Sequence, residues 1–140
     1  MTAPTPAPTD PAAYTHWVDE RVRFCDTDAM GHTNNVALAA HIESGRVAYT
    51  YDLMLRMRGE GRAITLRHLE VDYLREVRYP SLLRVGSRML AVGRTSFTVG
   101  TAVFDDDGCV ATSQGVLVAV GPDGPAPIEG AARALLEGEL

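Results

Sequence analysis

The spacing of apolar residues divides the chain into one long helix and several strands. Residues 35–57 contain no proline and a single glycine, Gly45, and their apolar residues recur at steps of three and four, which is the period of a helical face. The residues of this predicted face are Val36, Ala39, Ala40, Val47, Tyr51, Met54 and Leu55. A helix of this length spans about 35 Å, and Gly59 and Gly61 are expected to end it.

Alternating patterns predict strands on both sides of this helix. They cover residues 16–24, 63–77, 83–92, 96–104 and 110–120. In the second of these, Leu69, Val71 and Tyr73 alternate with polar residues, which favours a strand with a solvent-facing side at a sheet edge. Residues 128–136 suit a short terminal helix. One unbroken antiparallel sheet with the long helix packed on it is the economical arrangement, so we expect an α+β fold.

Composition narrows the class of protein. The 140 residues fit one domain, expected at 14–140, after a disordered tail at 1–13 that is rich in Pro and Thr. The chain shows no membrane-length apolar run and no secretory signal, which predicts a cytoplasmic protein with no membrane partner. The net charge of −5 comes without a basic stripe, which argues against nucleic-acid binding. Cysteine and histidine spacings predict neither a metal nor a cofactor.

Two aspartates lie between the first strand and the long helix. Asp26 and Asp28 are two residues apart, so in an extended segment they share a face. The helix start ahead of them offers unpaired N–H groups and a partial positive charge. A carboxylate beside such donors suits acyl transfer. The same spacing also suits the capping of a turn and a helix, and spacing alone leaves capping ahead of catalysis.

Two further polar residues have unusual positions. Glu43 lies four residues after Ala39 and four before Val47, inside the apolar face, where a carboxylate is unfavourable unless it is paired or functional. Pairing with Arg46 at the helix surface is the equal alternative. His32 precedes the helix and could bind a carbonyl oxygen or orient an aspartate, although a lone loop histidine is more often structural or solvated.

At this point the motifs resemble a known family. The run VRFCDTDAMGHTNN, a long helix with Glu43 and Arg46, and then HLEVDYL, VGRTSF and VLVAV resemble the hotdog-fold acyl-CoA thioesterases of the 4-hydroxybenzoyl-CoA thioesterase type. The resemblance spans about residues 15–136. It implies a five-stranded antiparallel sheet wrapped around one long central helix. It also implies a homodimer or homotetramer that pairs sheet edges and holds the active site between subunits.

The resemblance also implies roles for single residues. It makes Asp28 the catalytic carboxylate, as nucleophile or general base, and Asp26 a residue that shapes the loop. Of the other two expected catalytic residues, Glu43 would assist or position water, and His32 would shape the loop together with Asn35. Backbone amides at the helix start, around Asn34 and Asn35, would hold the thioester oxygen. Residues expected to contact the substrate are Gly31, Asn34, Asn35, Arg94 and Ser96, with Arg94 at the nucleotide end of coenzyme A.

The predicted activity is hydrolysis of an acyl-CoA to a free acid and coenzyme A. The chain departs from the family at Thr33, where valine is common, and at Ala37, Ala39 and Ala40, where aromatic residues are frequent. The small residues are expected to enlarge or reshape the acyl pocket. The alternatives are a thioesterase acting on an acyl carrier protein and a non-catalytic module that binds acyl-CoA.

Overall fold

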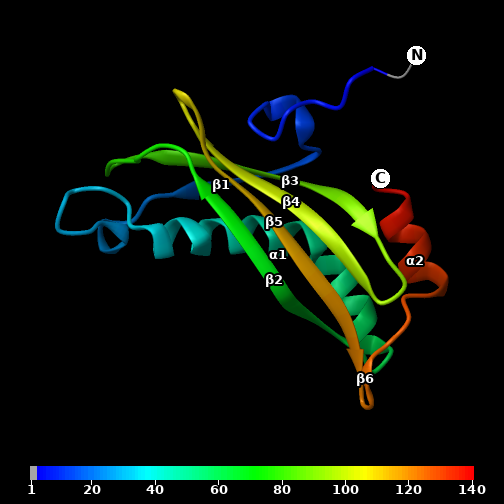
Figure 1. Cartoon of the computed structure of the whole chain (residues 1–140). Coiled ribbons are helices and arrows are strands. Elements are labelled where there is room, and N and C mark those ends of the chain that lie inside the picture. The colour runs from blue at the N-terminus through cyan, green and yellow to red at the C-terminus, as the bar shows by residue number, and fades with distance from the viewer. Residues whose placement is uncertain (1–2) are drawn as a thin grey trace.

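A computed structural model describes residues 3–140 and shows one sheet curled around a long helix, α1 (Figure 1). The strands are β1 (His16–Arg21), β2 (Ala63–Tyr73), β3 (Leu82–Val92), β4 (Ser96–Asp105), β5 (Gly108–Gly121) and the two-residue β6 (Gly124–Pro125). The helices are α1 (Asn35–Gly59) and α2 (Gly130–Glu137), with short 3₁₀ turns η1 (Pro11–Ala13) and η2 (Phe24–Asp26). The five long strands run in the order β1-β3-β4-β5-β2 with antiparallel neighbours. The predicted α+β class is therefore confirmed.

Strand β2 lies at an edge of the sheet, as its polar face predicted. It pairs with β5 on one side, and no strand within residues 3–140 pairs with its other side. Edge strands of this length expose unpaired N–H and C=O groups that can pair with another chain. The free edge of β2 is thus available to a second molecule.

The buried face of α1 is not the predicted one. The residues turned to the sheet are Ala37, Leu38, His41, Ile42, Gly45, Arg46, Thr50, Leu53 and Met57, whereas Val36, Tyr51 and Leu55 of the predicted face are 81%, 53% and 45% exposed. Both sides of the helix carry apolar residues at helical spacing, so the pattern could not show which side faces the sheet. Gly45 decides the packing, because a Cβ atom there would lie 2.3 Å from Val85 Cγ1 on β3.

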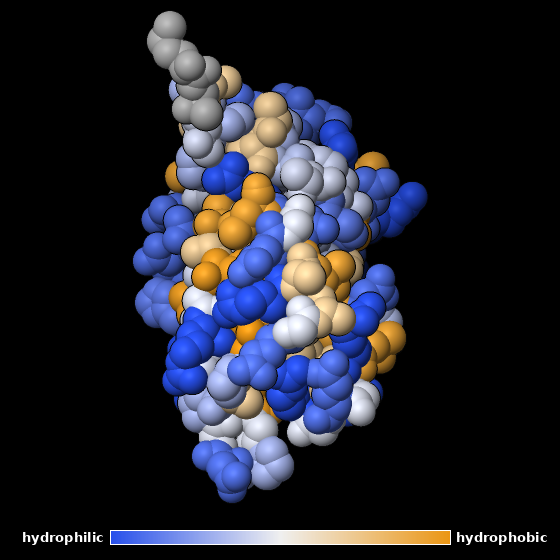
Figure 2. Space-filling view, turned by 90° about the vertical axis from the view of Figure 1, so that its right-hand side faces the viewer, coloured by the Kyte–Doolittle hydropathy of each residue, from blue (hydrophilic) through white to orange (hydrophobic). Residues whose placement is uncertain are grey.

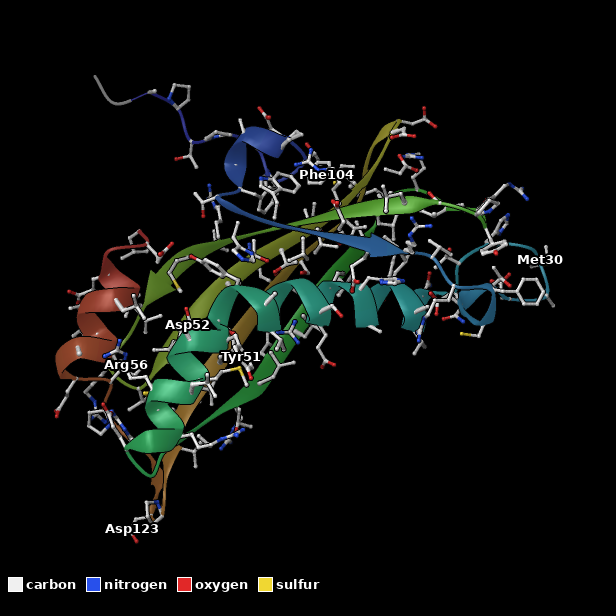
Figure 3. All side chains as sticks on the ribbon, turned by 180° about the vertical axis from the view of Figure 1, so that it is seen from behind. Met30, Tyr51, Asp52, Arg56, Phe104 and Asp123 are labelled. Atoms are coloured by element: carbon white, nitrogen blue, oxygen red, sulfur yellow. The ribbon has the colours of Figure 1, made fainter. Side chains whose placement is uncertain are left out.

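Two apolar clusters hold α1 against the sheet. One surrounds the first half of the helix and includes Leu38, Ile42 and Leu83; the other includes Leu53, Met57 and residues of α2. Seen from behind, α1 lies in front of the sheet, and its outer side is uncovered by the described chain (Figure 3). The surface at the α2 end mixes hydrophilic and hydrophobic residues (Figure 2). None of the helices in residues 3–140 has the length and apolar character of a membrane span.

The predicted tail, residues 1–13, falls partly outside the described residues, which begin at residue 3. Within it, Pro11–Ala13 form the 3₁₀ turn η1, capped by the Asp10 carboxylate. Ala13 and Tyr14 are buried against Phe104 and its neighbours on the outer side of the sheet. The division into a tail and a domain stays a prediction.

Candidate active site

Asp28 lies in a tight loop, residues 27–34, between η2 and α1. Its Oδ1 accepts hydrogen bonds from the backbone N–H groups of Met30 at 2.9 Å and His32 at 3.2 Å. The loop closes through Asp28 N–H to His32 O at 2.8 Å, and Gly31 turns it with a φ of +79°, a conformation that favours glycine. The second carboxylate oxygen, Oδ2, has no hydrogen bond within residues 3–140. Asp28 therefore both shapes the loop and keeps an exposed oxygen free.

The start of α1 provides hydrogen-bond donors next to this loop. Asn34 is the N-cap, and its side chain accepts from Ala37 N–H at 2.7 Å. The amide of Asn34 itself donates to Asp26 O at 2.8 Å, so it is occupied. Within the described chain, the amides of Asn35 and Val36 have no acceptor. The unpaired amides at the positive end of the helix are thus those of Asn35 and Val36, one residue later than the expected pair, Asn34 and Asn35.

Asp26 is buried beneath the loop and bound on two sides. Its carboxylate accepts from Arg23 N–H at 2.8 Å, from the Arg23 guanidinium at 2.9 Å and from His41 Nε2 at 3.1 Å. Burial alone would raise the pKa of Asp26, but the hydrogen bonds from Arg23 and His41 outweigh it and hold the pKa below its ordinary value. This geometry is that of a structural carboxylate, in agreement with the loop-shaping role implied for Asp26.

A cleft of about 290 Å³ joins the loop to the end of β2. Its lining residues are Asp28, His32, Thr33, Asn35, Leu38, Tyr73, Leu74, Arg75 and Glu76. The Tyr73 hydroxyl donates to Asn35 O at 3.0 Å, and His32 Nε2 lies 3.0 Å from Glu76 Oε2. The volume is at the lower limit for a small-molecule site. The structure thus brings Asp28, His32 and Asn35 together in one cleft beside the free sheet edge.

The other predicted site residues lie elsewhere. Glu43 is not buried within this chain: its side chain is 66% exposed and lies 3.7 Å from Arg46, on the uncovered side of α1. Arg94 and Ser96 lie at the β3–β4 turn, at the α2 end of the domain and opposite to the Asp28 loop (Figure 1). One chain therefore does not bring these three residues to Asp28.

Sequence reasoning missed His41, which has no partner at a local spacing. Its partner Asp26 is fifteen residues away, so only the folded chain shows the contact. Sequence reasoning placed Arg46 only at the helix surface, yet its side chain is buried and burial lowers its pKa. Across residues 3–140, no group of three or more His, Cys, Asp or Glu side chains is placed to hold a metal ion.

Comparisons with known proteins agree with this geometry. A family model described as "Thioesterase-like superfamily" matches residues 22–135. The uncharacterized protein YsmA of Bacillus subtilis (strain 168) is 33% identical over 78 residues, which cover 56% of this chain and 53% of YsmA. The chain thus spans about half the length of that relative.

Solved structures match over more of the chain. A thioesterase from Thermus thermophilus, complexed with coenzyme A and Zn, is 31% identical with a TM-score of 0.80, covering 88% of this chain and 98% of its own. A thioesterase-superfamily structure from Jannaschia sp. CCS1 is 27% identical with a TM-score of 0.78, covering 92% of this chain and 85% of its own. These matches confirm the hotdog fold and agree with the expected thioester-hydrolase class.

Proposed function

The chain belongs to the thioesterase-like superfamily, and we propose that it hydrolyses the thioester of an acyl-CoA to a free carboxylic acid and coenzyme A. The observation that carries this proposal is the cleft in which the exposed Asp28 carboxylate and the first turn of α1 at Asn35 meet. The coenzyme A in the Thermus thioesterase supports this substrate class. The 4-hydroxybenzoyl-CoA thioesterase type and a cytoplasmic location belong to the same proposal.

Asp28 acts on the thioester carbonyl in this mechanism. As general base, its Oδ2 takes a proton from water while the water oxygen attacks the carbonyl carbon. The amides of Asn35 and Val36 hold the oxyanion that forms. The C–S bond then breaks, and the coenzyme A sulfur takes the proton back from Asp28. As nucleophile, Asp28 would instead form an anhydride that water opens.

A second copy of the chain completes the site in this proposal. The cleft lies at the Tyr73 end of β2, whose outer edge is free, and the outer side of α1 exposes the apolar residues Val36, Tyr51 and Leu55. Pairing two β2 edges in antiparallel fashion brings the far end of one subunit toward the loop of the other. Arg94 and Ser96 would then reach the nucleotide end of a substrate bound at the partner's loop.

The test compares wild type with Asp28→Asn across a panel of acyl-CoA substrates, with thiol release as the readout. We expect Asp28→Asn to lower kcat by roughly 10²–10⁴-fold while the protein stays folded. Asp10→Asn is the matched control, because Asp10 lies just before η1, which packs on the outer side of the sheet, and asparagine keeps the capping oxygen. Near-normal turnover by Asp28→Asn would remove Asp28 from the mechanism. The panel also tests whether the acyl pocket is enlarged. Turnover of only short or benzoyl substrates would rule out the enlarged pocket.

One surface feature favours an acyl carrier protein as the alternative carrier. Beside the loop, Arg21 and Arg23 line a shallow groove with Phe24, Tyr79 and Leu82. Its lining has two basic side chains, no acidic one and exposed apolar groups, which suits an acidic protein partner.

Kinetics with one acyl group on both carriers separate the two candidates. For a carrier-protein substrate, Arg21→Glu should lower kcat/KM roughly tenfold and spare the acyl-CoA reaction. Arg56→Glu, at the other end of α1 (Figure 3), is the control. Equal losses with both carriers, or none, would reject the carrier protein as the partner of this groove.

A further inference from the structure

A buried cluster of titratable side chains lies behind the loop that carries Asp28. His41 extends from the sheet-facing side of α1 and is buried. Its Nε2 lies 3.1 Å from Asp26 Oδ2, and its Nδ1 lies 3.5 Å from Glu20 Oε1 on β1. Arg23 binds the same Asp26 carboxylate. One imidazole therefore joins β1, η2 and α1.

His41 contacts two carboxylates that come from two different elements. The contact of Nε2 with Asp26 has hydrogen-bond geometry, whereas Nδ1 lies further, at 3.5 Å, from Glu20 Oε1. Each ring nitrogen therefore faces one carboxylate, and Asp26 is shared between His41 and Arg23. Among residues 3–140, no other side chain forms an ion pair or hydrogen bond with the ring. The Cys25 thiol donates to Asp26 Oδ1 at 4.0 Å.

The cluster is connected to the reacting end of the site by short backbone links. The carbonyl of Asp26 accepts from the amide of Asn34, the residue that caps α1. This bond closes the base of the loop, and Asp28 is only two residues from Asp26. A shift of the Asp26 side chain would therefore move the loop and with it the free oxygen of Asp28.

We propose that His41 is a positioning residue: it ties β1 to the loop through Glu20 and Asp26 and so fixes the orientation of Asp28. This inference rests on the proposed thioester hydrolysis. His41 does not line the cleft, so it acts on turnover rather than on substrate binding. Without the ring, the Glu20 and Asp26 carboxylates lose their common partner, so the loop is held less firmly and turnover falls.

The first experiment measures kcat and KM for an acyl-CoA. We expect His41→Phe to lower kcat roughly ten- to hundredfold and to leave KM unchanged. His41→Gln, which keeps an amide donor on the side chain, should recover part of kcat. Glu137→Gln, which removes an exposed carboxylate paired with Arg133, is the control and should keep the wild-type kcat and KM.

The second experiment measures, without catalysis, how firmly His41 holds the loop. Amide hydrogen exchange in residues 27–34 should quicken in His41→Phe and stay at the wild-type rate in Glu137→Gln. Wild-type kcat or wild-type loop exchange in a folded His41→Phe would overturn the inference.

The two experiments also separate this inference from the proposed function. If His41→Phe does not fold, the kcat, KM and loop exchange of His41→Gln decide. If the wild type hydrolyses no acyl-CoA, the proposed function fails, whereas loop exchange still decides whether His41 holds the loop.

Discussion

Substituting Asp26 by alanine tests how the loop beneath the site is held. The change removes a carboxylate that is 2% exposed and leaves the buried ring of His41 facing an empty space. The Arg23 side chain is 65% exposed, so water can replace its contact, and most of the loss comes from His41 and the loop. Removing one partner of a buried pair costs about 3–5 kcal/mol. We expect the lower end, about 3 kcal/mol, which is a large part of a typical domain's stability.

The loss should depend on pH with a defined sign. The pKa of Asp26 lies below its ordinary value of 3.8 in the folded protein. A carboxyl with a lowered folded pKa adds stability that is fully present above the unfolded value and is lost as the pH falls through the folded one. The difference in stability between wild type and Asp26→Ala should therefore be full at pH 7 and shrink below about pH 4.

Urea unfolding at pH 7 and below about pH 4 measures the difference in stability between the two proteins. The fluorescence of the single tryptophan, Trp17, follows the unfolding. Met57→Ala is the matched control: Met57 is 1% exposed in the cluster near α2, and its truncation should cost about 2–5 kcal/mol. Under conditions where both variants are folded, only Asp26→Ala should lose acyl-CoA turnover. Equal unfolding midpoints for wild type and Asp26→Ala, or equal losses of turnover in the two variants, would refute the reasoning.

Two further predictions concern packing and assembly. Gly45→Ala should lower stability by roughly 1–3 kcal/mol through its clash with Val85, despite a gain in helix propensity of about 1 kcal/mol. Gly59→Ala, with nothing within 4 Å of the new Cβ, should not lower the thermal midpoint; a Gly45→Ala midpoint at or above that of wild type would contradict the packing. Tyr51→Glu should convert the proposed dimer to monomer in analytical ultracentrifugation, and an unchanged sedimentation coefficient would place the interface elsewhere.

The elements were predictable because each follows from a local pattern. The absence of proline predicted α1 to within two residues of its observed end at Gly59, and the polar alternation of β2 predicted its place at the sheet edge. The burial of α1 was not predictable in this way. Val36 and Ala37 are adjacent in sequence and both apolar, yet one is exposed and the other buried, because the close approach of Val85 at Gly45 sets the rotation of the helix.

In the candidate site, too, local contacts were predictable and contacts between distant elements were not. Asp28, His32 and Asn35 lie within eight consecutive residues, so a local motif could bring them together. The contacts of His41 with Asp26 and Glu20 join three elements, and they depend on which side of α1 faces the sheet. A wrong helix face in the sequence analysis therefore hid His41 and made Glu43 look buried.

Glu43 is exposed because of the way α1 is rotated against the sheet, and a second copy of the chain could cover it. Its side chain is exposed on the outer surface of α1, as are those of Tyr51 and Leu55. An apolar helix face that stays in water gives up the stabilisation of burial, so a partner that covers it is favoured. If that partner is a second copy, Glu43 moves from solvent to the wall of the site without any change within the chain. The exposed Glu43 of one chain and its predicted role in the site are then consistent with each other.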